Sequence, residues 1–323
     1  MSEPHSGPST AIEVLTVANL SPLLMEALKR EFVVHHRLHE SDAAAFAAVA
    51  PRIQAIAASG ESKVGTALMD QLPALRVISV MGVGYDGIDI AAAKARSVVV
   101  THTPGVLNDD VADLALALML AAARGIATAD RYVRGGHWMK GPMPLARKMS
   151  GARLGLVGMG RIGQAIAHRA QAFGMSIAYT ARTAKPEVPY RYWPSARALA
   201  AECEFLVVIT PGGAATRKLI DAGVLAALGT KGYLVNVARG SVIDQAALVD
   251  ALQRGVIAGA GLDVFENEPE VPQALFSMDN VVLTPHIGSA TAQTRGAMAD
   301  LAFRNLQALF AGQPLPSAVP ECR

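Results

Sequence analysis

Cysteine is almost absent from this sequence, and aromatic and charged residues are scarce. The chain of 323 residues has two cysteines, Cys203 and Cys322, which are too few for a disulfide framework or a thiolate metal site. A cytoplasmic location fits this cysteine content. Aromatic residues make up 5% and charged residues 17%, whereas hydrophobic residues reach 51%, which is typical of compact globular proteins and not of disordered ones. A chain of this length is expected to form about two domains.

The sequence also lacks a concentration of charge of either sign. Lysine and arginine total 29 against 27 aspartate and glutamate residues, and no dense basic run is present that would neutralise several phosphates. Nucleic-acid binding is therefore not expected. The longest apolar run, Leu114–Ala123, is too short to span a bilayer and predicts a buried helix. Residues 1–10 are polar and have no export-signal pattern, so we expect no membrane association.

What the sequence does contain is a glycine motif between a strand and a helix. Gly158, Gly160 and Gly163 follow the apolar run Leu154–Val157 and precede the helical pattern Gln164–Phe173. In such a unit the first glycine makes a tight turn, the second lets backbone approach a pyrophosphate, and the third lets the helix pack closely on the strand. The phosphates then lie at the helix N-terminus. This context predicts a dinucleotide site.

The second strand of this unit lacks the acidic residue that normally binds the ribose hydroxyls. Ser176–Thr183 has a neutral Thr180 at the expected position, and Arg182 and Thr183 follow it. A carboxylate repels the extra phosphate of NADPH, whereas a guanidinium with nearby hydroxyls binds it by charge-assisted hydrogen bonds. A lone arginine after a strand is usually only solvated, but the missing acid favours the functional interpretation. We therefore predict NADPH as the preferred cofactor, with NADH as a weaker one.

Alternating strands and helices form two successive runs along the chain. The first run predicts a small parallel α/β unit with strands at Glu13–Val17, Val33–His36, Ala55–Ala58, Val77–Val80 and Ser97–Thr101. A turn signal at Thr103–Gly105 marks a crossing, and a long helix at Asp109–Arg124 follows. The second run predicts a doubly wound sheet of five strands, the glycine-motif strand being followed by Phe205–Thr210, Tyr233–Val237, Gly259–Val264 and Val281–Thr284. The closing helix, Ala290–Phe310, is expected to return to the first unit.

Polar residues follow the strands of the second run at their carboxyl ends. In open parallel sheets, ligands bind beyond this edge. The residues there are Thr210 and Pro211, Ala238 to Gly240, Asp263 to Glu268, and His286. We expect these positions to converge on one crevice.

Three sequence blocks at these strand ends resemble the signature blocks of the D-isomer-specific 2-hydroxyacid dehydrogenases. They are Asn236–Gly240, Gly261–Pro269 and Thr284–Ala290, and they stand in the family's order behind the glycine motif. Nearly the whole chain fits this family. The resemblance implies a doubly wound parallel Rossmann sheet inserted into a second, smaller flavodoxin-like α/β domain. The implied boundaries are residues 1–103 plus 292–323 for the substrate-binding domain and residues 104–291 for the dinucleotide-binding domain.

By the same resemblance, the catalytic residues are Arg239, Glu268 and His286. Reduction of a 2-oxo acid needs a hydride at the carbonyl carbon, a proton at its oxygen and a cation beside the carboxylate. His286 is suited to donate the proton, Glu268 to stabilise the imidazolium, and the planar fork of Arg239 to bind the carboxylate. Each residue alone has a structural alternative, such as a loop cap, a surface acid or an ion pair with Asp244. Their joint occurrence at successive strand ends favours catalysis.

The resemblance also assigns binding contacts. The expected cofactor contacts are Gly158, Gly160, Arg161, Ile162, Gly163, Arg182, Thr183, Thr210, Pro211, Val237, Ala238, Asp263, His286, Gly288 and Ser289. The block Met81–Asp86 resembles the family's substrate-carboxylate loop. There the amides of Val83 and Gly84 are expected to bind the substrate, together with Arg239 and His286, and a simple turn is the alternative.

Two features of the binding region leave questions open. Val111 stands where many members of the family carry a threonine, which puts that one contact in doubt. Trp138 and Met139 lie in a loop that lines the substrate pocket or reaches the partner subunit in relatives, and the sequence does not decide between these roles.

Within the family, Pro104–Val111 and Pro144–Gly151 look like the NADPH-linked glyoxylate/hydroxypyruvate reductases and 2-ketogluconate reductases. We therefore predict hydride transfer from NADPH to glyoxylate or hydroxypyruvate, giving the D-2-hydroxy acid. The alternatives are another D-2-hydroxyacid dehydrogenase, acting on 2-ketogluconate or 3-phosphoglycerate, and a non-catalytic, dinucleotide-sensing corepressor. The family is typically dimeric, and the apolar Leu114–Ala123 suits burial at such an interface.

No metal site is expected, although the chain contains eight histidines. His35, His36 and His39 have no cysteine or paired acid at ligand spacing, so we interpret them as surface residues. His102 and His137 likewise have no partner that is visible in the sequence.

Overall fold

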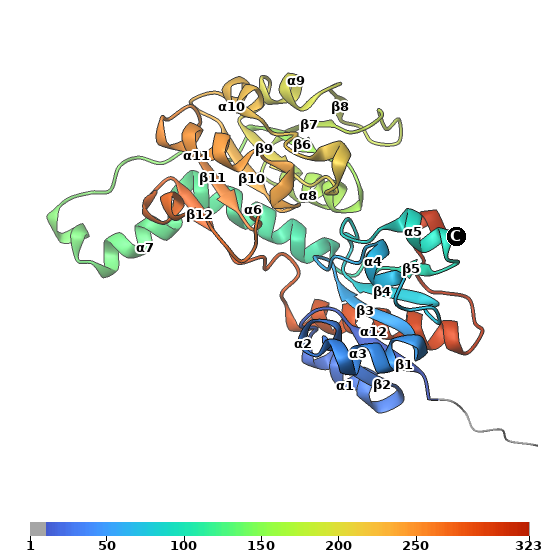
Figure 1. Cartoon of the computed structure of the whole chain (residues 1–323). Helices are drawn as coiled ribbons and strands as arrows, with labels where there is room; N and C mark the ends of the chain where they lie inside the picture. The colour runs from blue at the N-terminus through green and yellow to red at the C-terminus, as the bar shows by residue number, and fades with distance from the viewer. Residues whose placement is uncertain (1–10, 323) are drawn as a thin grey trace, which may run out of the picture. The chain divides into compact units, whose positions relative to one another are not determined.

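The computed structural model describes residues 11–322, which form two compact units (Figure 1). One unit contains the described residues up to Val106 and those from Thr291 onward, and the other is Leu107–Ala290. The sequence analysis placed these crossings at 103/104 and 291/292. The polar residues 1–10, in which no export signal is expected, lie outside the described residues.

The first unit contains a five-stranded parallel sheet in the order β2-β1-β3-β4-β5. This is the strand order of flavodoxin-like folds, so the expected fold of this unit is confirmed. Its strands are β1 (Glu13–Thr16), β2 (Val33–His36), β3 (Ile53–Ser59), β4 (Val77–Met81) and β5 (Val99–Thr101). Its helices are α1 (Pro22–Glu31), α2 (Leu38–Ser41), α3 (Ala43–Val49), α4 (Thr66–Met69), α5 (Ile90–Ala95) and α12 (Ala292–Phe310), with short 3₁₀ turns η1 (Ala50–Arg52) and η6 (Pro320–Cys322).

Polar residues placed before the apolar segments start the helices of this unit. The side chains of Ser21, Asp42 and Asp89 accept hydrogen bonds from first-turn amides of α1, α3 and α5. The closing helix α12 returns to this unit, as predicted, and packs on β4. There the hydroxyl of Ser79 donates to the carbonyl of Ala302 at 2.9 Å.

The second unit contains a seven-stranded parallel sheet in the order β12-β11-β10-β9-β6-β7-β8. Its strands are β6 (Arg153–Val157), β7 (Ser176–Thr180), β8 (Arg191–Tyr192), β9 (Phe205–Val208), β10 (Tyr233–Asn236), β11 (Gly259–Leu262) and β12 (Val281–Leu283). Its helices are α6 (Asn108–Arg124), α7 (Ile126–Arg134), α8 (Arg161–Gln171), α9 (Ala196–Ala200), α10 (Ala222–Leu228) and α11 (Gln245–Gln253). Four 3₁₀ turns complete it: η2 (His137–Lys140), η3 (Ala214–Thr216), η4 (Gly240–Val242) and η5 (Gln273–Ser277).

The order of these strands is that of a doubly wound Rossmann sheet with one added edge strand, which confirms the predicted fold class. The predicted number of five strands is wrong: the count left out β7, although Ser176–Thr183 was itself predicted as a strand, and β8 was not predicted at all. β8 has only two residues, and Arg191 and Tyr192 pair with β7 at the sheet edge. A strand this short and polar has no apolar run that a sequence pattern would reveal.

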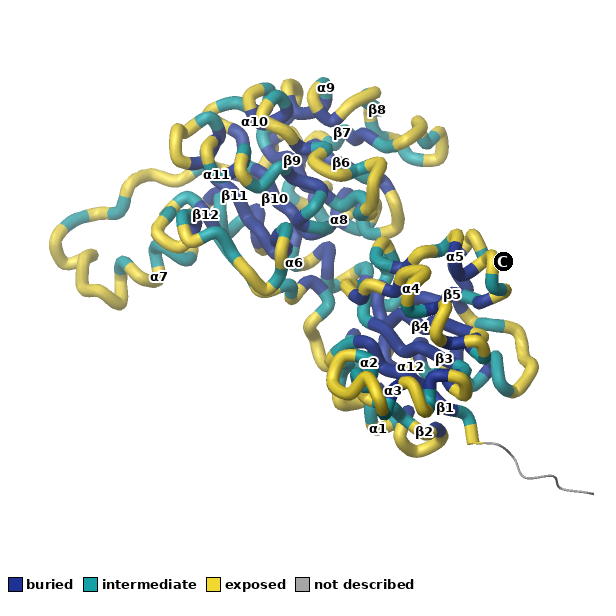
Figure 2. The backbone as a smooth tube through the Cα atoms, in the orientation of Figure 1, coloured by how far each residue is buried: buried dark blue, intermediate teal, exposed yellow. Residues whose placement is uncertain are grey.

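Each unit has its own apolar core, and the strands that carry it are buried (Figure 2). The apolar stretch Leu114–Ala123, predicted as a buried helix, is part of α6 and is partly buried inside its own unit, and its place at a subunit interface stays a prediction. There α6 packs on α8, β10 and β11. Among the described residues no single helix is long and apolar enough to cross a membrane. The pair α6 and α7, bent by 58°, passes the same test of length and composition.

The three glycines of the motif meet the three expected steric demands. Gly158 has a φ of +112°, and a Cβ there would lie 2.6 Å from the carbonyl oxygen of Ile209. A Cβ on Gly163 would lie 2.4 Å from the carbonyl oxygen of Gly158, so the helix packs directly on the turn. A Cβ on Gly160 would meet nothing within 4 Å, which leaves room for a ligand beside the backbone.

Helix α8 begins at Arg161, three residues before the predicted start at Gln164. Gly160 is its N-cap, with an extended backbone at φ −79° and ψ −165° and no side-chain hydrogen bond to the first turn. In the first turn the residue on the packed side is Gly163, which has no side chain. The apolar pattern of the helix therefore starts only after this turn. The amides of this first turn are therefore available for an anion.

The interpretation of His35 as a surface residue is wrong. Its Nε2 lies 2.7 Å from Oε2 of Glu13, and its side chain is only 15% exposed. Glu13 also binds Arg52, whose Nε donates to it at 2.6 Å. The acid partner stands on the neighbouring strand β1, far away in sequence, so spacing along the chain gave no sign of it.

The contrast between Gly163 and Gly160 leads to a stability prediction. Gly163→Ala places a methyl group against a backbone carbonyl and should reduce the free energy of unfolding by about 1–3 kcal/mol. Gly160→Ala fills open space and is the matched control, with a smaller loss of stability that reflects only the change of the N-cap residue. Thermal unfolding followed by circular dichroism measures both variants. Equal melting temperatures for the two would contradict the steric roles described here.

Candidate active site

Three adjacent strands of the second unit deliver the predicted catalytic residues. β10, β11 and β12 are parallel neighbours, and their carboxyl ends lead into the loops that carry Arg239, Glu268 and His286, respectively. Because the ends of parallel neighbours meet at one edge of the sheet, the three loops lie next to one another.

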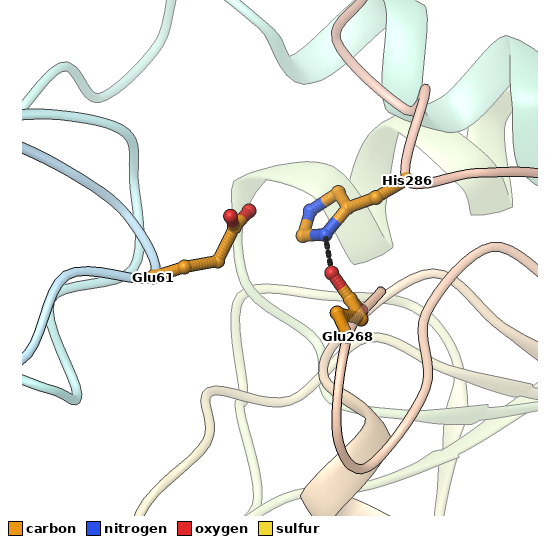
Figure 3. Close-up of side chains that lie close together, drawn as sticks. All are labelled: Glu61, Glu268 and His286. Atoms are coloured by element: carbon orange, nitrogen blue, oxygen red, sulfur yellow. Dashed lines mark hydrogen bonds and ion pairs between the residues drawn. The ribbon is translucent and has the colours of Figure 1, made fainter. Parts of the chain in front are cut away.

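Glu268 and His286 are in direct contact. Nδ1 of His286 lies 2.7 Å from Oε2 of Glu268, and the two side chains are 28% and 24% exposed, respectively (Figure 3). The other oxygen of Glu268 accepts a hydrogen bond from the amide of Phe265 at 2.9 Å. Both carboxylate oxygens of Glu268 therefore accept hydrogen bonds. Because Nδ1 of His286 faces this acceptor, Nε2 is the ring nitrogen that can act on a substrate.

The charge state of Glu268 is set by its surroundings. Burial raises the pKa of this carboxyl, but the hydrogen bonds from His286 and the Phe265 amide, with the charges of His286 and Arg239, outweigh it and hold the pKa below its ordinary value of 4.5. Glu268 is thus a carboxylate across the neutral range. Because the charge of Arg239 lowers this pKa, the third predicted catalytic residue interacts electrostatically with Glu268.

Buried Asp263 holds the loop that carries His286. Its side chain accepts hydrogen bonds from the hydroxyl of Thr284 at 2.7 Å and from the amides of Ile287 and Gly288 at 2.8 and 2.9 Å. Its carbonyl oxygen accepts the amide of His286 at 2.9 Å. The residue is only 2% exposed. The resemblance assigned it to the cofactor, which stays a prediction, and did not indicate this supporting role.

His286 has a backbone conformation that residues other than glycine rarely adopt, with φ at +51°. Such a left-handed residue is unfavourable by about 1–3 kcal/mol and persists only where its surroundings impose it. The hydrogen bonds from both sides of the residue to Asp263 impose it here. No sequence signal for this conformation is present, because histidine, unlike glycine, does not mark it.

The loop of Arg239 is fixed by its neighbours on both sides. The Asn236 side chain accepts from the amide of Ala238 at 3.0 Å and donates to the carbonyl of Arg239 at 3.0 Å. At Gly240 an added Cβ would lie 1.9 Å from the carbonyl carbon of Phe265. The Arg239 loop is thus in van der Waals contact with the loop of Glu268, an approach that only glycine allows.

The predicted cofactor contacts occupy the same edge of the sheet. Arg161 is exposed and Ile162 is half-buried at the start of α8, and Arg182 and Thr183 are exposed just after β7. Val237 and Ala238 are buried at the end of β10, and Pro211 is exposed after β9, beside the half-buried Thr210.

Gly288 and Ser289 follow His286. A Cβ on Gly288 would lie 3.4 Å from a methyl of buried Val111, so Val111 borders this loop although it has no hydroxyl to offer. The open space at Gly160 and the uncapped amides of α8 fit a dinucleotide pyrophosphate.

The predicted substrate loop, Met81–Asp86, belongs to the first unit and follows β4. The amides of Val83 and Gly84 donate to no acceptor among residues 11–322. A Cβ on Gly82 would lie 2.9 Å from Cα of Gly60. The loop is therefore tightly packed at Gly82 and offers two unpaired amides beyond it.

Trp138 and Met139 lie on an arm formed by α7, η2 and the segment up to Leu145. Several apolar side chains of this arm are exposed, and Met139 reaches 95%. In Figure 1 the arm extends away from the sheet of its own unit. It carries most of the exposed large apolar residues of the second unit, including Ile126 and Val133.

Comparison with known proteins gives consistent results. Residues 116–288 match the sequence model of the D-isomer specific 2-hydroxyacid dehydrogenase NAD binding domain. Hydroxyphenylpyruvate reductase from Plectranthus scutellarioides and 2-ketogluconate reductase from Gluconobacter oxydans are each 44% identical, over 96% of this chain and 99% of the relative. The crystal structure of an NADPH-dependent glyoxylate/hydroxypyruvate reductase from Sinorhizobium meliloti, in complex with NADP and malonate, is 45% identical. It aligns with a TM-score of 0.92 over 97% of this chain and 98% of that one.

The lowered pKa of Glu268 predicts a pH-dependent stability. Because the pKa is lower in the folded state, the carboxylate stabilises the fold above its ordinary value of 4.5, and this contribution is lost as the pH falls through the folded value. The difference in unfolding free energy between wild type and Glu268→Gln should therefore be largest near neutral pH and shrink in acid. Urea unfolding across this range measures it. The exposed Glu270→Gln serves as control, and a pH-independent difference for Glu268→Gln would refute the linkage.

Proposed function

This chain belongs to the D-isomer specific 2-hydroxyacid dehydrogenase family, as its sequence blocks predicted, and we propose that it reduces a small 2-oxo acid to the D-2-hydroxy acid with NADPH. Glyoxylate and hydroxypyruvate are the proposed substrates. The observation that carries the proposal is the contact between His286 and Glu268 at the carboxyl edge of a Rossmann sheet. This pair provides a proton donor where the bound cofactor provides a hydride.

His286 is the proposed acid. Its Nδ1 is engaged by Glu268, so Nε2 is the nitrogen that delivers the proton to the substrate oxygen. An imidazole titrates near neutrality, and a carboxylate at 2.7 Å favours its protonated form. Glu268 also fixes the ring in one orientation, which the left-handed backbone at residue 286 further restricts.

Arg239 is the proposed anchor of the substrate carboxylate. Its planar guanidinium presents parallel donors that match a carboxylate and polarise the neighbouring carbonyl oxygen. The Asn236 side chain and the contact at Gly240 hold the loop from which it extends. A lysine there would supply the charge without this geometry.

The cofactor is proposed to lie along α8 and the strand ends beside it. Gly160 and the first-turn amides of α8 would hold the pyrophosphate, and Arg182 with Thr183 would hold the additional phosphate of NADPH. Neutral Thr180 ends β7 where an acid would repel that phosphate. The relative from Sinorhizobium meliloti, described as NADPH-dependent and solved with NADP, supports this preference.

The choice among 2-oxo acids follows the names of the relatives. Hydroxyphenylpyruvate, glyoxylate, hydroxypyruvate and 2-ketogluconate all share a carbonyl next to a carboxylate, which Arg239 and His286 would treat alike. 2-Ketogluconate is the second candidate, because the reductase named for it matches over 96% of this chain. The presence of all three predicted catalytic residues, Arg239, Glu268 and His286, disfavours a purely sensory, corepressor-like role.

The oligomeric state and the location complete the proposal. We propose a homodimer formed through the apolar arm of α7 and η2, because several large apolar side chains of this arm are exposed. Sedimentation equilibrium distinguishes this dimer from a monomer. A cytoplasmic location agrees with the two free cysteines.

The reductase chemistry is tested by His286→Ala. Without the proton donor, turnover of NADPH with glyoxylate or hydroxypyruvate should fall about 10²- to 10⁴-fold, while NADPH binding persists. Absorbance at the nicotinamide band measures turnover, and protein fluorescence measures binding. His168→Ala, an exposed histidine in the last turn of α8, is the control. Turnover of His286→Ala near that of wild type would overturn the assignment of the acid.

The cofactor preference is tested by Arg182→Ala. Loss of a charge-assisted hydrogen bond to the phosphate should raise the KM for NADPH about tenfold or more and leave the KM for NADH unchanged. Arg197→Ala, an exposed arginine of α9, is the matched control. A wild-type enzyme that prefers NADH would refute the prediction outright.

A further inference from the structure

We propose that His102 is a positioning residue that orients the amides of Val83 and Gly84 to bind the carboxylate of the substrate. The inference rests on the proposed function, since it concerns the substrate of that reaction. It gives a role to a histidine for which the sequence showed no partner. All the contacts that carry it lie within the first unit.

The imidazole of His102 contacts the loop directly. Its Nδ1 lies 3.0 Å from the carbonyl oxygen of Val83. A carbonyl oxygen only accepts hydrogen bonds, so Nδ1 carries the hydrogen and donates it. One residue further along, the amide of Thr103 donates to the carbonyl of Gly82 at 2.8 Å. Residues 102 and 103 thus hold two consecutive carbonyl groups of the loop.

Holding these carbonyl groups also fixes the amides that follow them. A trans peptide is planar, and its C=O and N–H point in opposite directions. The Gly82 carbonyl shares a peptide plane with the Val83 amide, and the Val83 carbonyl shares one with the Gly84 amide. Both amides therefore point away from residues 102 and 103.

Neither of these amides donates to an acceptor within the described residues 11–322. Two successive outward amides form a concavity that suits a small anion such as a carboxylate. The carboxylate receives two donors whose directions are already set, so ordering them on binding requires little further loss of freedom.

His102 is itself firmly held. Its residue is only 9% exposed, and its carbonyl oxygen accepts from the hydroxyl of Ser317 at 2.6 Å. The amide of Ser317 donates to the side chain of fully buried Asn305, which in turn donates to the carbonyl of Leu301 in α12 at 2.8 Å. The long closing helix thereby supports the histidine through a buried polar network.

Tyr85, a residue of the same loop, packs against the histidine. Its ring lies edge-on to the imidazole, with centroids 5.3 Å apart and planes at 90°. The hydroxyl of Tyr85 donates to the carboxylate of Glu321 at 3.1 Å, and burial together with Glu321 raises the pKa of this hydroxyl to about 12. Tyr85 therefore stays a neutral donor, and its contact with the imidazole is a second contact between His102 and the loop Met81–Asp86.

Two variants with amide side chains test the role of the Nδ1 donor. Asparagine places an amide nitrogen where Nδ1 stands, whereas glutamine reaches the position of Nε2 instead. His102→Gln should raise the KM for glyoxylate or hydroxypyruvate about tenfold, with little change in kcat or in NADPH binding, and His102→Asn should stay within about threefold of wild type. His36→Gln is the control, because it removes a histidine that contacts Thr16 in the same unit, away from the loop.

Calorimetric titration with malonate, in the presence of NADP, gives a readout that does not depend on turnover. Weaker malonate binding in His102→Gln, restored in His102→Asn, supports the inference even if the wild-type chain reduces none of the 2-oxo acids and the proposed function fails. Equal KM and equal malonate affinity in His102→Gln and His36→Gln would overturn it. So would a wild-type protein that reduces 2-oxo acids but in which His102→Gln changes kcat alone.

Discussion

The buried carboxylate of Asp263 is the constraint on which the arrangement of the active site depends. It binds two amides and a hydroxyl of the loop beyond β12, and its own carbonyl binds the amide of His286. Hydrogen bonds to a charged group contribute about 1.5–3 kcal/mol each, which is enough to offset the left-handed backbone of His286. Removal of one such partner would leave a buried charge less satisfied. The imidazole is thus placed by a residue that does not itself need to touch the substrate.

Close backbone approaches perform a comparable role for the other loops. Gly240 allows the Arg239 loop to lie against Phe265, three residues before Glu268, so the cation and the acid are held by one contact. Gly158 brings the glycine turn against Ile209, just after β9, and Gly163 brings the first turn of α8 against the glycine turn. In each case the glycine excludes a side chain where backbone must meet backbone. Rigid elements then determine where the reactive side chains extend.

The sequence predicted much of this arrangement, and the physical basis of each success and failure is specific. The glycine motif and the apolar strands β6, β9, β10 and β11 have strong local patterns, and these indicated the sheet and the three site loops. β8 is too short to have such a pattern, and the partner of His35 lies on a neighbouring strand. The apolar Leu114–Ala123 indicated burial correctly but did not reveal what covers it, because periodicity is the same for a core helix and an interface helix. The supporting role of Asp263 and the conformation of His286 depend on tertiary contacts that local sequence does not encode.

In His286 and His102 the same ring atom, Nδ1, contacts partners of different charge. In both, Nδ1 is engaged, but the partner of His286 is a carboxylate and the partner of His102 is a carbonyl group. An anionic partner stabilises the charged imidazolium and so suits a residue that must gain and release a proton. A neutral carbonyl inside a buried network favours a ring that keeps one hydrogen in one place. Partner chemistry, more than residue type, therefore separates the proposed proton donor, His286, from the histidine proposed to orient the substrate loop.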